Sequence, residues 1–343
     1  MKYSVLLILL SIPAVFGADQ AGAQEKSWTF SFYFENDLFA DTDQNYTNGV
    51  KLTWISYDLT SYAESGKLPD WSLPYIHRLP FINEPGLQRN IALSIGQNMY
   101  TPQDISRRDL IDDDRPYAGW TYFDIAFHSK NDRRLDTMEI QLGIVGPASF
   151  AEETQSLVHE LRGSQHPNGW DNQIKNEPGL AIVYERKLRL FQAGSCNDLG
   201  FDAITHLGGT LGNVYTYANT GMEVRVGLNI PTDFGDAVIR PAGDTNAPVN
   251  ARDPRLSEKN GFGLYVFSSV SGRVVLCDIF LDGNTFTDSH SVDKKYFVAD
   301  VAAGVSLVIH HFKLSYAQVL RTKEFKGQQE NHSFGSITIS FSW

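Results

Sequence analysis

The chain is poor in cysteine and, beyond its first residues, has no long apolar run. Cys196 and Cys277 are the two cysteines among 343 residues, so the fold does not rest on a disulfide framework. After residue 16 no apolar stretch reaches the ~20 residues that a membrane-spanning helix requires. Internal repeats and low-complexity tracts are also missing. Turn formers and aromatics are plentiful, with 28 Gly, 21 Phe, 15 Tyr and 6 Trp.

The first residues, 1–23, have the pattern of a secretory signal peptide. Lys2 precedes an apolar run over 5–16, and small residues end at Ala23. A basic start, a short apolar region and an A-x-A-like site are typical of such a peptide. We expect cleavage after Ala23, which leaves one mature domain at 24–343. An exported chain without a spanning helix is either soluble or a β-barrel, and the mean hydropathy of −0.25 does not separate these classes, because barrel strands hide their apolar residues by alternation.

The last nine residues, GSITISFSW, alternate apolar and polar side chains up to the end of the chain. Ile337, Ile339, Phe341 and Trp343 share one face, because side chains in a strand have a period of two. This pattern resembles the closing strand of bacterial outer-membrane barrels, although it also fits a half-buried strand of a soluble sandwich. The stretch WTFSFYFEN favours the membrane, because it places four large aromatics in a row on one face, as lipid and interface belts require.

The same alternation recurs along the chain and predicts a transmembrane antiparallel β-barrel of about twelve strands. Charges on the polar faces, such as Lys51, Glu139 and Lys313, suit a polar lumen better than a dry core. An even strand number places both termini in the periplasm, so that connections after odd-numbered strands face outside. The expected strands are 27–36, 47–58, 89–101, 117–129, 136–146, 179–193, 200–213, 216–229, 262–280, 294–309, 312–325 and 334–343.

Two expected periplasmic connections are longer than such turns usually are. The first, 59–88, contains PDWSLPYIHRLPF, and we expect it to lie along the membrane interface. The second, 230–261, reads as a flexible polar loop to which we assign no chemistry. The strand layout places Cys196 and Cys277 toward opposite barrel ends, which argues against a disulfide between them. Four tryptophans are expected to be interface anchors, namely Trp28, Trp54, Trp120 and Trp343.

The stretch FENDLFADTDQNYTNGV gathers oxygen-bearing side chains at one strand joint. Asn36 and Asp37 end the first expected strand, and Thr47 begins the second. The hairpin therefore brings these three residues to the same external rim. Taken alone, asparagine and aspartate at a hairpin joint are more simply explained as turn formers.

The third external connection, 147–178, predicts a short helix in SFAEETQSLVHELRG. Its apolar residues recur at helical intervals, its acidic residues come early, as the helix dipole favours, and Gly163 is a plausible stop. Gln155 and His159 are four residues apart and share one helix face. A lone histidine there is more often a surface residue, but a neutral imidazole can also take a proton from water near neutral pH.

Three separated motifs resemble the lipid A 3′-O-deacylase family of outer-membrane enzymes. They are FENDLFADTDQNYTNGV, the QSLVH helix with the following GWDNQIKNE, and DRPYAG. The similarity runs through most of the mature chain, in the family's order. The resemblance implies a twelve-stranded barrel in the outer membrane with a calcium-dependent ester hydrolase site. That site is expected between the outer barrel wall and a helix from an external loop, facing the outer leaflet, with lipid A or lipopolysaccharide as substrate.

The resemblance also implies roles for particular residues. His159 matches the base that activates water, and Gln155 is its partner on the helix. Asn36 and Thr47 match rim residues of the family's site. Asp37 is the candidate ligand for Ca²⁺, a hard cation that carboxylate and carboxamide oxygens suit. The ion would polarise the ester and stabilise the oxyanion that forms when water attacks.

A basic residue of the family falls near Arg107, although Arg108 fits nearly as well. We expect Arg107, Arg108 and Arg115, with bound divalent ions, to offset the phosphates of the substrate. Where the family has an acidic residue six positions after the histidine, this chain has Gln165. Any role that requires a carboxylate at that position is therefore in doubt.

Two other functions remain open from the sequence. An outer-membrane phospholipase needs similar barrel and calcium chemistry, but such enzymes generally use a serine nucleophile, and no matching Ser/His pair stands out on the strand faces. In a non-enzymatic porin or adhesin, the rim cluster would be part of a surface loop without catalytic function. A barrel of about twelve strands is, however, narrow compared with porins of 16–18 strands. We expect no nucleic-acid partner, and the sequence points to no protein partner.

Overall fold

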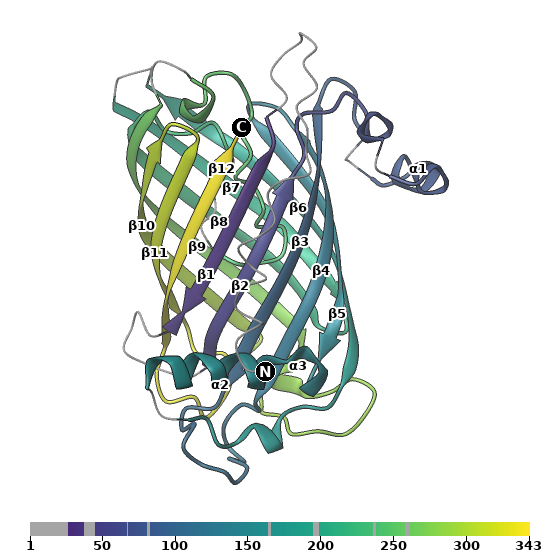
Figure 1. Ribbon diagram of the computed structural model, residues 1–343, viewed down its shortest axis with the longest axis vertical. Helices are drawn as coiled ribbons and strands as arrows, with labels where there is room; N and C mark the ends of the chain where they lie inside the picture. The colour runs from purple at the N-terminus through teal and green to yellow at the C-terminus, as the bar shows by residue number, and fades with distance from the viewer. Residues whose placement is uncertain are drawn as a thin grey trace.

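The computed structural model describes residues 27–37, 45–66, 68–80, 83–163, 166–194, 199–235, 238–257 and 261–343. The expected signal peptide, Cys196 and Gln165 lie outside these residues. The described strands close into one antiparallel barrel, in which each strand pairs with its neighbours in sequence and β1 pairs with β12 (Figure 1). The expected fold is confirmed.

No strand boundary differs by more than four residues from the expected one. The strands are β1 Thr29–Asn36, β2 Asn45–Ile55, β3 Gln88–Thr101, β4 Ala118–Lys130, β5 Arg134–Val145, β6 Glu177–Ala193, β7 Leu199–Gly212, β8 Tyr215–Leu228, β9 Phe262–Asp278, β10 Phe297–Ile309, β11 Phe312–Arg321 and β12 His332–Ser342. The helices are α1 Leu73–Ile76, α2 Ala151–Arg162 and α3 Ile279–Asp282, with short 3-10 turns between them. Within the described ranges, no helix combines the length and the apolar character needed to cross a bilayer.

Alternation along the strands separates the lumen from the outer wall. Where β1 meets β12, small hydroxyl side chains face inward, and Ser31 Oγ lies 2.9 Å from Ser340 Oγ. Outward side chains such as Phe123 and Leu142 are 50% and 55% exposed. Trp120 corrects one expectation, because it shares the inward face of β4 with Asp124 and is 1% exposed. It packs in the lumen and is not an interface anchor.

The connection between β8 and β9 turns back into the barrel and fills part of the lumen. We call its described residues, 229–235 and 238–257, the plug. Asn246 donates from Nδ2 to the hydroxyl of Tyr33 at 2.7 Å. Lys130 Nζ donates to the carbonyl of Pro248 at 2.8 Å. The expectation of a flexible polar loop was wrong, because this loop finds its hydrogen-bond partners on the inward faces of the strands.

A cluster of opposite charges holds the plug to the wall. The carboxylate of Asp233 lies 2.6 Å from Arg225 Nη1, 2.6 Å from Lys313 Nζ and 3.1 Å from Arg255 Nη2. All four side chains are buried. A buried charge is tolerated when it is paired. Removal of one partner leaves the other charge buried and uncompensated, which destabilises the fold. The polar lumen expected from the strand faces is confirmed.

The connection between β2 and β3 covers the outside of the barrel at the end where β1 begins and β12 ends. We call its described residues, 56–66, 68–80 and 83–87, the arm, and Figure 1 shows it extending sideways. Tyr62 packs edge-on against Phe127, an outward residue of β4 that the arm buries. Trp71 and Tyr75 remain 74% and 66% exposed. The position of the arm along a membrane interface stays a prediction.

Candidate active site

The rim residues come together where β1 ends and β2 begins. Asn36 pairs with Asn48 across the hairpin. A bulge in the pairing of β2 with β3 falls between Tyr46 and Asn48, so Thr47 is the extra residue. Bulges re-aim side chains and are common beside active sites. The hydroxyl of Thr47 lies 2.6 Å from that of Thr101 at the end of β3.

Two polar residues of this rim, Asn36 and Asp37, are buried. Alternation places Asn36 on the face of β1 that carries Phe32 and Phe34, which points away from the lumen. Asn36 is nevertheless 5% exposed, and Asp37 is 0% exposed. Taking a carboxylate out of water is unfavourable unless a positive charge or several donors compensate. The rim therefore contains a buried acid directly after the outward-facing Asn36.

Helix α2 buries two polar residues against the protein and exposes leucines together with Glu152, Glu153 and Glu160. Ala151, Gln155 and His159, spaced by four residues, are all buried, at 1%, 3% and 5% exposure. Leu157 and Leu161 are 39% and 66% exposed. This arrangement is the reverse of a helix on a soluble protein, whose apolar stripe faces the core. It suits a helix that lies between a polar wall and lipid.

The start of α2 is fixed tightly against β3 and β4. A Cβ atom on Gly119 would lie 2.1 Å from Ser149 Oγ and 2.3 Å from Ala151 Cβ, so only glycine permits this approach. The carbonyl of Ser149 accepts hydrogen bonds from Gln97 Nε2 and from Thr121 Oγ1, each at 2.7 Å. These contacts place the first turn of α2 directly on the outer wall.

Trp170 fixes the second residue of the buried stripe. Its indole Nε1 donates to Gln155 Oε1 at 2.8 Å, and its ring packs in one cluster with Met99 and Ala151. Met99 lies two residues before Thr101 on β3, so Gln155 is held near the part of the wall that Thr47 contacts. The sequence gave no sign of this hydrogen bond.

His159 follows Gln155 by one turn on the same buried stripe. Helix α2 contacts β3 and β4, and Figure 1 draws it across the rim ends of β1 to β4. The prediction that Gln155 and His159 share a face, and that Asn36, Asp37 and Thr47 share a rim, agrees with this geometry. The roles expected of these residues stay predictions.

The expected cations differ in position. Arg107 is exposed in the connection between β3 and β4 and makes no ion pair within the described ranges. Arg108 lies 3.5 Å from Asp171, with both side chains exposed. The expectation that Arg115 offsets substrate phosphates was wrong. Arg115 is 1% exposed, lies 3.2 Å from Glu324 and is stacked over the ring of Tyr100. It cannot meet a substrate phosphate at the surface.

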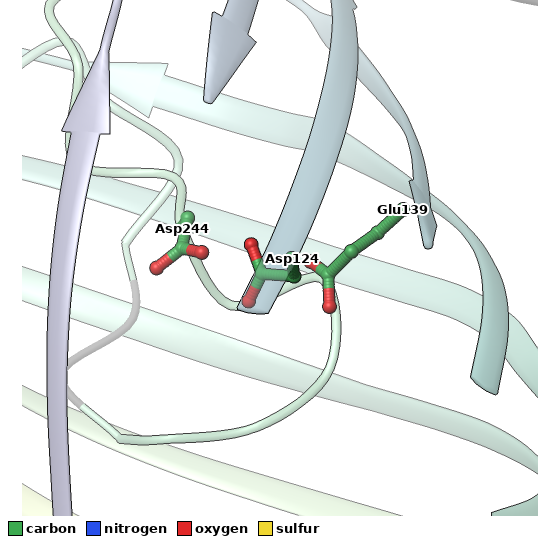
Figure 2. A group of neighbouring side chains, drawn as sticks. All are labelled: Asp124, Glu139 and Asp244. Carbon is green, nitrogen blue, oxygen red and sulfur yellow. The ribbon is translucent and has the colours of Figure 1, made fainter. Parts of the chain in front are cut away.

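A second group of carboxylates lies inside the barrel. Asp124, Glu139 and Asp244 each offer an oxygen within 4.8 Å of the others, and Figure 2 shows Asp124 between its two neighbours. Such a group could hold a metal ion. The ammonium of Lys51, however, lies 3.0 Å from Asp124 and 2.7 Å from Asp244, and Glu139 accepts the backbone N–H of Ala242. We therefore assign this cluster to anchoring the plug.

Comparison with known proteins gives a family and a fold. A family model described as outer membrane protein LpxR matches residues 4–343. LpxR from Salmonella typhimurium superposes with a TM-score of 0.70 and 18% identity, covering 91% of this chain and 99% of that one. The beta domain of the Bordetella autotransporter Brka gives a TM-score of 0.39 and 8% identity, covering 92% and 98%. No match was found among curated proteins.

Proposed function

Because the chain belongs to the LpxR family of outer membrane proteins, we propose that it is a calcium-dependent esterase that hydrolyses the 3′-linked acyl or acyloxyacyl ester of lipid A. The observation that carries this proposal is the inverted helix α2. Its Gln155 and His159 are buried, whereas Leu157 and Leu161 are exposed. A helix that only shielded the wall from lipid would not need a buried imidazole.

In this proposal His159 is the general base. A neutral imidazole accepts a proton from water near neutral pH, which makes the water a nucleophile toward the ester carbonyl. Gln155, held by the indole of Trp170, would orient the ester beside that water. Asn36 would donate from its carboxamide to the carbonyl oxygen as negative charge develops there.

The rim residues have the chemistry of a calcium site. Asp37 offers a carboxylate, Asn36 a carboxamide oxygen and Thr47 a hydroxyl, which are the hard oxygen ligands that calcium prefers. The full burial of Asp37 is easier to sustain beside a cation. A bound calcium ion would supply positive charge to the ester carbonyl oxygen in the transition state.

The substrate would approach from the lipid side of the wall. With both termini in the periplasm, as is usual for such barrels, the rim beside α2 faces the outer leaflet, where lipid A resides. The exposed Leu157 and Leu161 would contact acyl chains. Arg107, which is exposed and makes no ion pair in the described part of the chain, would face the phosphates.

The experiment is a mass spectrum of lipid A after incubation with the purified barrel and calcium. We expect a mass loss equal to the 3′-linked group, and no loss when a chelator replaces calcium. Unchanged masses from a folded, calcium-loaded sample would contradict the proposal. Release of fatty acid from glycerophospholipid, but not from lipid A, would make the protein a phospholipase.

Asp37→Asn tests the metal role. The substitution keeps the size of the side chain but removes its charge, so we expect the calcium concentration for half-maximal activity to rise by at least about tenfold, equivalent to ~1.4 kcal/mol of binding free energy. Asp112→Asn, which removes an exposed charge from the neighbouring rim connection, is the control. Equal calcium requirements for both variants would remove Asp37 from the site.

A further inference from the structure

The outer wall has a notch on the side of the barrel that faces away from α2. Strands β7 to β10 form it, with a volume of about 660 Å³. In the closed strand order, β9 lies six places from β3 in either direction, and so on the opposite side of the barrel. The volume falls in the range of about 300–1,000 Å³ typical of small-molecule sites. A molecule in this notch cannot be the one that α2 contacts.

Small residues make the notch, and larger apolar residues border it. A Cβ atom on Gly272 would meet no atom within 4 Å, so the wall is hollow at that point of β9. Ala218 and Ala299, on the flanking strands, also line the hollow. Leu207 and Phe297 border it and are 67% and 76% exposed. Because this surface continues the apolar outer wall, its natural occupant is a lipid chain.

Two lysines without acidic partners stand at the rim end of the same notch. Lys295 and Lys323 line it, and neither forms an ion pair within the described residues. Their neighbours behave differently, since Lys294 lies 2.6 Å from Asp282 and Lys326 lies 3.2 Å from Asp293. On a chain with a net charge of −11, two unpaired cations above an apolar hollow call for an anionic ligand.

The backbone holds both lysines in place. Lys295 N donates to the carbonyl of Glu324 at 2.7 Å, and Thr322 N donates to that of Ala299 at 2.9 Å. These bonds tie the connection before β10 to the connection after β11. The two lysines therefore lie on adjacent, mutually bonded segments that border the hollow.

We propose that the lysine notch, lined by Gly272, Lys295 and Lys323, binds a second molecule of lipid A, with an acyl chain in the hollow and a phosphate between the two ammonium groups. Lysine binds phosphate as a point charge, and burial of an acyl chain against the hollow adds apolar contact. The choice of lipid A rests on the orientation given under the proposed function, which places the rim in the outer leaflet. The site is non-catalytic, because it has no contact with α2.

The test is native mass spectrometry of the detergent-solubilised barrel with added lipid A, in a chelator that prevents turnover. The double variant Lys295→Ala/Lys323→Ala removes the cations, and Gly272→Phe fills the hollow. Arg78→Ala/Arg252→Ala removes the same charge from exposed residues at the opposite end of the barrel. We expect lipid A to bind the first two variants at least about tenfold more weakly than the wild type and the control.

Wild-type affinity in the lysine and Gly272 variants would overturn the proposal, as would equal weakening in the arginine control. Phosphatidylglycerol serves as a second ligand, and binding as tight as that of lipid A would overturn the choice of lipid. Deacylation is measured separately in calcium and should be unchanged in all three variants. Lysine-dependent binding without any deacylation by the wild type would refute the proposed function and leave the lysine notch standing.

Discussion

Among single residues, Glu324 shows how charges at the rim end of the lumen depend on one another. Burial raises the pKa of this carboxyl, but Arg321, Arg115 and Arg273 outweigh burial and hold its pKa below the usual 4.5. A carboxyl whose pKa is lowered by folding stabilises the folded state above its unfolded pKa, and this stabilisation is lost as pH falls through the folded pKa. Glu324 therefore stabilises the fold at neutral pH and less so in acid.

Glu324→Gln should remove this acid sensitivity. As the pH falls below the ordinary carboxyl value of 4.5, the thermal midpoint of the wild type should fall, because the Glu324 carboxyl takes up a proton more readily in the unfolded chain than in the fold. The variant should start lower, since Arg115 loses its partner, and should change less over the same range. The midpoint is measured by circular dichroism of the barrel strands. Glu330→Gln, an exposed acid on the same connection, should behave as the wild type. An equally steep fall in Glu324→Gln would contradict this account.

Expectations for single residues were correct where the spacing along one element determines which side chains share a face. They were wrong where a partner distant in sequence determines whether a side chain is buried. The four-residue spacing of Gln155 and His159 fixes a common helix face whatever the helix packs on. Arg115, by contrast, reads as a loop cation until Glu324, 209 positions away, is seen to bury with it. The residues around Arg115 in the DRPYAG motif do not indicate its pairing with Glu324.

Among the elements, α2 approaches the wall so closely that its position should control the reaction. Gly119→Val should push the start of the helix outward, because even a Cβ atom would lie 2.1 Å from Ser149 Oγ. Lipid A deacylation should fall by at least about tenfold, corresponding to ~1.4 kcal/mol in the barrier, as His159 moves away from the rim. The rate is measured by lipid A mass spectrometry, and retention of the barrel by its heat-dependent shift on electrophoresis.

Gly272→Ala is the matched control for Gly119→Val. It also adds a Cβ atom to an outward glycine of the wall, but at a place where no atom lies within 4 Å. Its deacylation rate should equal that of the wild type. Full activity in Gly119→Val would show that the position of α2 is irrelevant to the reaction.

The elements predicted from the sequence are those with a period. Alternation of apolar and polar residues predicts strands such as β1 and β12, and a period of 3.6 residues predicts helix α2. The plug has neither pattern, and its acids pair with bases on remote strands, as Asp233 does with Lys313 at 2.6 Å. The sequence predicted inward charges such as Lys51. It did not predict that the connection between β8 and β9 would fold into the lumen and pair with them.

For the whole molecule, the plug occupies part of a lumen that in a porin is open to water. The plug is tied to the wall through Asp233, Asp244 and Asn246. We expect the wild type in planar bilayers to give no steady conductance above background. Deletion of 236–257, which retains the strands, should open a conducting path. Steady, ion-selective conductance by the wild type would instead support the porin alternative.

The sequence predicted which residues belong to the candidate site, but it did not predict which face of α2 is buried there. The motifs placed Asn36, Asp37 and Thr47 on one rim, and the helix pair on one face. They could not show that α2 is inverted, with its polar stripe buried and Leu161 exposed, because helical periodicity defines two faces without saying which one meets lipid. That orientation supports the hydrolysis that we propose.

The central claim is that the buried imidazole of His159 activates the water that cleaves lipid A. The most direct measurement is the lipid A mass spectrum after incubation with wild type, His159→Ala and His166→Ala, each folded and loaded with calcium. His166 is an exposed histidine of the same connection and serves as the control. We expect loss of the 3′-linked group with wild type and His166→Ala, and no change with His159→Ala. Turnover by His159→Ala at the wild-type rate would contradict the claim.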